Sequence, residues 1–169
     1  MPGPGTIASA LFPTPAEKMF AAWLRERPGV PAVQRLTPTT QEHLLGVLQQ
    51  ILSYPKEVNV DREDVWEVLA GAGSLQFGTA TASGPARVGV VSRQVWTITT
   101  TPGNAESPVK QVLVAIHSGS APAFNTDEPA QILALATERV GDQAEIVFGH
   151  GHDAQSGESI RVMLLINRH

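Results

Sequence analysis

The chain has 169 residues, of which 42% are hydrophobic, and its formal net charge is −4 with a pI of about 5.7. This length fits one domain, or one domain with an appended segment, and allows a sizeable buried core. The 12 Lys and Arg residues form no basic stripe, which argues against nucleic-acid binding. The absence of cysteine excludes disulfides and thiolate metal sites. Because there is no secretory signal and no apolar run of about 20 residues, we expect a soluble cytoplasmic protein without a membrane span.

The first part of the chain, residues 1–36, is expected to be separate from a main domain at 37–169. It begins with a tail rich in Pro and Gly, continues as a short amphipathic helix from Pro15, and ends in a proline-containing connector. The apolar residues of this helix recur at helical spacing and are Met19, Phe20, Trp23 and Leu24. Two interpretations stay open: the helix binds a partner, or it packs back on the main domain and covers an apolar face.

The next segments favour two helices separated by a loop. The first is predicted over Thr39–Ser53, with Thr39 or Thr40 as the cap and Glu42 in a capping box. A loop is expected at 56–61. The second helix is predicted to end at Gly71, and its inward residues are Val65, Val68 and Leu69.

The remainder is typical of a sheet with further helices. The predicted strands are Ser74–Ala82, Val109–His117, Ala144–Gly149 and Ser159–Asn167. A helix is predicted over Thr126–Val140, ended by Gly141. The connection Asp153–Glu158 suits an antiparallel hairpin between the last two strands. The segment 86–101 is rich in Val and Thr, so its local propensity favours a strand.

Several short motifs occur in a fixed order along the chain. They are Asn59-x-Asp61-x-x-Asp64, Phe77–Gly84, Val112–Ile116, Ala144–Gly149 and Ile160–Ile166. In this order and spacing, the chain from about Glu42 to Arg168 resembles the C-terminal domain of FtsZ, the bacterial tubulin homologue. The resemblance implies an α+β fold, a two-layer α/β sandwich with a mixed four-stranded sheet plus N-terminal helices. It also implies that the segment 86–101 is a helix, against its local propensity.

The same resemblance suggests a role for the motif Asn59–Asp64. In FtsZ this loop points into the nucleotide site of the neighbouring subunit, which implies that Asp61 and Asp64 are catalytic in trans and that Asn59 shapes the loop or contacts the nucleotide. Carboxylates suit this chemistry because they position water and reach a hard cation. The competing interpretation is that Asp61 or Asp64 only caps the following helix. The glycine-rich phosphate loop of FtsZ has no counterpart, so we expect the chain alone to bind no cofactor, with GTP and Mg²⁺ present only in trans.

Three histidines are candidates for a metal site. His150 and His152 are two residues apart and would share one face of a strand, and His117 could complete a zinc site with them. Strands also carry polar pairs on a solvent-facing side, and the FtsZ family has no metal at this position. We therefore expect no metal.

The leading functional hypothesis is a cell-division or cytoskeletal assembly module that is non-enzymatic on its own. It would regulate or dock to an FtsZ-type partner, or associate with itself. One alternative is a GTPase that is completed in trans by a nucleotide-binding domain. Another is a diverged α/β sandwich that binds a small molecule or has a structural role.

Overall fold

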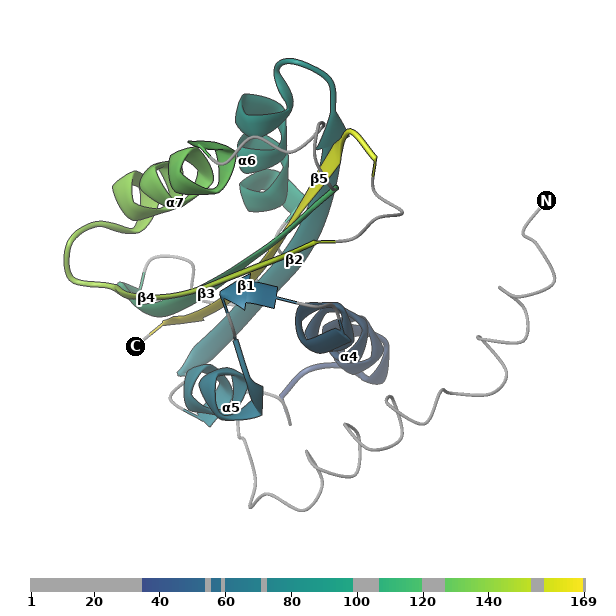
Figure 1. Ribbon diagram of the computed structural model, residues 1–169. Coiled ribbons are helices and arrows are strands. Elements are labelled where there is room, and N and C mark those ends of the chain that lie inside the picture. The colour runs from purple at the N-terminus through teal and green to yellow at the C-terminus, as the bar shows by residue number, and fades with distance from the viewer. Residues whose placement is uncertain are drawn as a thin grey trace, which may run out of the picture.

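A computed structural model describes residues 35–53, 56–58, 60–70, 73–98, 107–119, 127–152 and 157–168 (Figure 1). Its helices are α4 (Pro38–Ser53), α5 (Arg62–Ala70), α6 (Arg87–Ile98) and α7 (Asp127–Val140). Its strands are β1 (Lys56–Val58), β2 (Ser74–Ser83), β3 (Val109–Ser118), β4 (Glu145–His152) and β5 (Ser159–Arg168). None of the helices in these ranges is long and apolar enough to cross a membrane.

The sheet has the strand order β1-β4-β3-β5-β2 and is mixed, because β3 and β4 are parallel while every other pair is antiparallel. Its four long strands confirm the predicted sheet. The expected loop at 56–61 is wrong for its first three residues, which form β1 beside the end of β4. Lys56 pairs with Gly151, and Val58 pairs with His150. A strand of three residues is too short to show the alternation that predicts strands.

The predicted hairpin between the last two strands is wrong. β3 lies between β4 and β5, parallel to the former and antiparallel to the latter. The segment Val112–Ile116 of β3 is buried throughout, so this strand needs neighbours on both edges and helices on both faces. β3 is therefore the central strand of the sheet, with β4 on one of its edges and β5 on the other.

Helices cover both faces of the sheet (Figure 1): α6 and α7 lie on one side, and α4 and α5 lie on the other. Alternate strand residues feed the two cores because successive side chains point to opposite faces. The core under α4 and α5 contains Leu44, Leu48, Ile51, Val65, Leu69, Leu75, Phe77, Leu113, Met163 and Leu165. The core under α6 and α7 contains Val91, Val95, Val112, Val114, Ile116, Ile132, Ala136, Ile160, Val162, Leu164 and Ile166. The sheet with α6 and α7 is the expected sandwich, and the preceding helices pack behind it.

Within the segment 86–101, residues 87–98 form helix α6, as the family resemblance implied. Val91 and Val95 are fully buried one helical turn apart, over β2 and β5. Trp96 packs against the same core, and the guanidinium of Arg139 lies 5.4 Å from the centre of its ring. The local preference of valine for strands is overridden because helical spacing places Val91 and Val95 on one face toward the sheet.

The N-terminal cap of α4 is Thr37, and the prediction of Thr39 or Thr40 is wrong. The Thr37 hydroxyl accepts a hydrogen bond of 3.2 Å from the backbone N–H of Thr40, and Pro38 occupies the first helical position. We expect Thr37→Ala to lower the free energy of unfolding by about 1 kcal/mol. Thr39→Ala is the matched control, and urea titration that found equal losses for both variants would contradict this assignment.

Candidate functional site

The segment before α5 forms a reciprocal cap between the two predicted catalytic carboxylates. Oδ1 of Asp61 accepts hydrogen bonds from the backbone N–H groups of Glu63 at 2.9 Å and Asp64 at 3.0 Å. Oδ2 of Asp64 accepts from the backbone N–H of Asp61 at 2.9 Å. This is the geometry of a capping box, so both side chains have the structural role that sequence analysis gave as the competing interpretation.

Capping leaves both carboxylates able to interact with a ligand. The side chain of Asp61 is exposed and that of Asp64 is half-buried. The cap uses one oxygen of each group, so the second oxygen of each stays available among the described residues. Glu63, also exposed, adds a further negative charge to the first turn of α5. The arrangement can accept hydrogen bonds from water or bind a hard cation.

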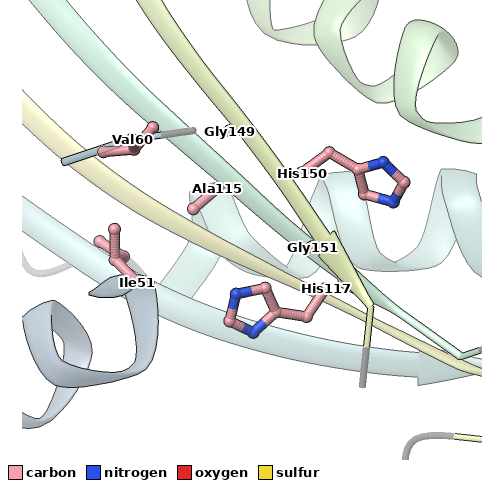
Figure 2. A pocket seen from close by; sticks show the side chains of 7 residues that line it. All are labelled: Ile51, Val60, Ala115, His117, Gly149, His150 and Gly151. Carbon is pink, nitrogen blue, oxygen red and sulfur yellow. The ribbon is translucent and has the colours of Figure 1, made fainter. Parts of the chain in front are cut away.

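Val60 anchors this segment and was not identified from the sequence. It is 2% exposed, and its side chain lies in a small recess that has no room for a water molecule (Figure 2). The other residues that line the recess are Ile51, Ala115, His117, Gly149, His150 and Gly151. Because β1 pairs with β4 immediately before Val60, the loop is held to the sheet just before the cap. The sequence offered one indication of this buried position, since Val60 is a single apolar residue between the polar residues Asn59 and Asp61.

A buried polar network holds the opposite end of α5. The Asn167 side chain is fully buried and donates a hydrogen bond of 2.9 Å to the backbone carbonyl of Val68. It also exchanges hydrogen bonds with Gln111, from Nδ2 to Oε1 at 2.9 Å and from the Gln111 backbone N–H to Oδ1 at 3.1 Å. The amide of Gln111 continues to Glu145 at 3.2 Å. This network fixes α5 against three neighbouring strands, β5, β3 and β4.

The three histidines do not converge. His117 pairs in register with Gly151, so it points to the face of α4 and α5, whereas His150 points to the other face (Figure 2). His152 lies two residues after His150 on β4, so it shares the face of His150. The suggestion that His117 completes a metal site is therefore wrong. His150 is buried, its Nε2 lies 2.9 Å from the hydroxyl of Ser118, and its ring makes an edge contact with His152 at 5.0 Å. Within the described ranges, no group of three or more potential metal ligands occurs.

Other predicted site residues fall outside the described ranges. Asn59 is one of them. The predicted partner-binding residues are the others, namely Met19, Phe20, Trp23 and Leu24. The described part of the site therefore consists of the Asp61–Asp64 cap, its anchor Val60 and the network behind α5.

The Asp61–Asp64 cap should contribute to the free energy of unfolding. We expect Asp61→Ala to lower the free energy of unfolding by about 1–2 kcal/mol, because two backbone N–H groups lose their acceptor. Asp61→Asn should retain most of the stability, since asparagine caps helices about as well as aspartate. Chemical unfolding of the three proteins checks this, and an Asp61→Asn variant as unstable as Asp61→Ala would contradict it.

Comparison with known proteins gives a clear result for structure and none for sequence. No family model matches the chain, and no curated protein matches it by sequence. FtsZ from M. jannaschii, described as an empty dimer, superposes with a TM-score of 0.59 at 16% identity, covering 89% of this chain and 43% of that one. CetZ1 from Haloferax volcanii, a GDP-bound monomer, gives 0.53 at 18% identity, with 89% and 48% covered.

TubZ from Bacillus thuringiensis serovar israelensis, in GDP-form protofilaments, gives a TM-score of 0.57 at 13% identity and covers 75% of this chain and 36% of that one. The fold is tubulin/FtsZ-like. The chain spans less than half the length of each of these three structures. The structural agreement confirms the fold that the sequence motifs implied, at identities where sequence comparison alone finds no relative.

Proposed function

We propose that this chain is an FtsZ-type assembly or regulatory module that presents the Asp61–Asp64 cap to a nucleotide bound by another subunit. The observation that carries the proposal is the cap itself, a pair of accessible carboxylates held in one geometry by the start of α5. The FtsZ-like motif order and the tubulin/FtsZ-like fold support the same interpretation.

The proposed chemistry needs little from this chain except position and charge. An accessible oxygen of Asp61 or Asp64 would accept a hydrogen bond from the attacking water and orient it toward the terminal phosphate of a partner's nucleotide. The other carboxylate would face a Mg²⁺ ion, either directly or through water. Because Val60 and β1 hold the loop to the sheet, the carboxylates would be ordered before the partner binds, which lowers the entropy lost on docking.

The experiment is to add the purified chain to polymerising FtsZ from the same source and to measure GTP hydrolysis and pelleted polymer. We expect a concentration-dependent change in both. Asp61→Asn combined with Asp64→Asn should abolish the effect on hydrolysis, because asparagine retains the cap and removes the charge. The matched control is Glu67→Gln, which removes an exposed charge on α5 outside the cap.

Two outcomes would contradict the proposal. Wild-type chain without effect on hydrolysis or polymer would exclude an FtsZ-type partner. Equal effects from the wild type and the double asparagine variant would leave docking intact but exclude a role for the carboxylates.

A second candidate is a GTPase completed in trans by a separate nucleotide-binding domain. It is favoured by the share of the neighbouring structures that this chain covers, which is 48% or less in the three compared. Mixing the chain with such a domain should then create GTP hydrolysis that neither component has alone. Acceleration of an already active FtsZ would instead support the regulatory role.

A further inference from the structure

Strand β2 forms one edge of the sheet. It pairs with β5 along all ten residues, from Ser74↔Arg168 to Ser83↔Ser159, without a register shift. On its other side, no strand lies beside it within the described ranges. Its outer row of backbone N–H and C=O groups is therefore a template for one more strand.

Within the described ranges, strand β2 itself lacks the usual features by which proteins prevent such pairing. The sequence of β2 is SLQFGTATAS, which contains no charged residue and no proline. Its ladder also has no bulge, whereas the β1–β4 and β3–β5 ladders each have a register shift. Short length, charged side chains, proline and bulges are the usual protections of an exposed edge. The opposite edge is different, since β1 is only three residues long and contains Lys56 and Glu57.

We propose that β2 pairs antiparallel with β2 of a second copy of this chain, so that two five-stranded sheets join into one of ten strands. A second copy fits because an uncharged strand meets no like-charge repulsion when it pairs with itself, and the two-fold symmetry closes the assembly at two subunits. This pairing does not depend on the nucleotide role proposed for the loop before α5.

The polar side chains of β2 favour a register centred on Ala80. This register places Thr79 opposite Thr81 of the second copy, a pair type that stabilises antiparallel sheets. The hydroxyl of Thr79 is buried and has no hydrogen-bond partner within the described ranges. The Thr81 hydroxyl across the edge accepts a hydrogen bond of 3.2 Å from Nε of Arg161, and it would donate its own hydrogen to Thr79. Buried hydroxyls normally have such a partner.

The helices that flank β2 are compatible with this dimer. On the face of α4 and α5, Leu75 and Phe77 are buried, while Thr81 and Ser83 further along are exposed. Antiparallel pairing about an axis perpendicular to the sheet places the covered half of one β2 beside the open half of the other. The two copies of α4 therefore do not compete for the same space.

On the opposite face, α6 lies over β2 and β5. The axes of the two α6 helices would be about two strand spacings apart, close to 10 Å. This is near the normal distance between packed helices, which is about 8–10 Å. The helices on this face therefore neither clash nor leave a gap.

Cysteine cross-linking tests both the pairing and its register. The chain has no cysteine, so introduced thiols have no competitor. Thr79→Cys mixed with Thr81→Cys should form a disulfide-linked dimer under mild oxidation, faster than either variant alone. Directly opposed residues are within disulfide reach, whereas diagonal ones are about 7–8 Å apart. A wild-type dimer in which the mixed pair does not cross-link would overturn the proposal.

Charge substitution at the edge gives an independent test by light scattering. Wild type should be a dimer, and Thr81→Lys, at an exposed position, should raise its dissociation constant about fivefold or more. An equal mixture of Thr81→Lys and Thr81→Glu should restore the dimer, which shows that both variants are folded. The control is Ala134→Lys on the exposed side of α7, which should leave the dimer unchanged. A monomeric wild type overturns the proposal, whether another part of the chain covers the edge or nothing does.

Discussion

Glu128→Ala is expected to lower the free energy of unfolding by about 3–5 kcal/mol, because it leaves the buried Arg87 guanidinium without its carboxylate. The two groups form an ion pair between the starts of α6 and α7 that uses both carboxylate oxygens. Nε of Arg87 lies 3.1 Å from Oε1 and 2.8 Å from Oε2 of Glu128, and Nη2 lies 2.8 Å from Oε2. Their side chains are only 9% and 15% exposed, so water screens the pair weakly. Arg87 also donates to the backbone carbonyl of Glu158, which joins the turn before β5 to the pair.

The measurement is urea unfolding followed by circular dichroism. The double variant Arg87→Met with Glu128→Leu serves as the control, because it removes both charges and retains most of the apolar volume. We expect it to be more stable than Glu128→Ala, since replacing a whole buried pair is often neutral. A double variant at least as unstable as Glu128→Ala would show that the contacts of Arg87 beyond Glu128 dominate.

Asn167→Leu should lower the free energy of unfolding by about 3 kcal/mol or more, because buried polar groups lose their partners while the apolar side chain excludes water. The groups affected are the backbone carbonyl of Val68 and the backbone N–H and side-chain carbonyl of Gln111. Lys110→Leu, at an exposed position on β3, is the matched control and should change stability by less than about 0.5 kcal/mol.

The same variant should loosen α5 selectively. Because Asn167 accepts and donates across β3, β5 and α5, its loss should speed amide hydrogen exchange in 62–70 more than in α7. Equal protection of α5 in wild type and Asn167→Leu would show that apolar packing alone fixes the helix, and the network would then have no part in positioning the Asp61–Asp64 cap.

Local patterns predicted most elements of this fold but not their neighbours. The buried run in β3 and the apolar spacing in α4 and α7 depend on residues close in sequence, and these predictions are confirmed. The hairpin prediction failed because the closeness of β4 and β5 in sequence favoured their pairing. Instead β3, which is buried on both faces, lies between these two strands. In α6, the burial of apolar side chains against β2 and β5 outweighs the local preference for a strand. Only the family motifs indicated the helix.

In the candidate site too, local patterns predicted some features, while others depend on contacts distant in sequence. The motif identified Asp61 and Asp64, and the capping alternative was visible from their position before a helix. The opposite orientations of His117 and His150 follow from the register of β3 against β4, which no local pattern determines. Local patterns identify Asn167 only as the end of a strand, since its partner Val68 is 99 residues away.

The position of β5 between β3 and β2 has a consequence for biosynthesis. β2 has no strand partner within the described ranges other than β5, and β5 follows the other described strands in the sequence, so it leaves the ribosome after them. Until β5 is placed between them, β2 is not joined to β3, so the sheet closes late and depends on contacts distant in sequence, a topology that folds slowly. During this interval the uncharged β2 exposes both of its edges, so nascent chains on neighbouring ribosomes are expected to meet first through this strand.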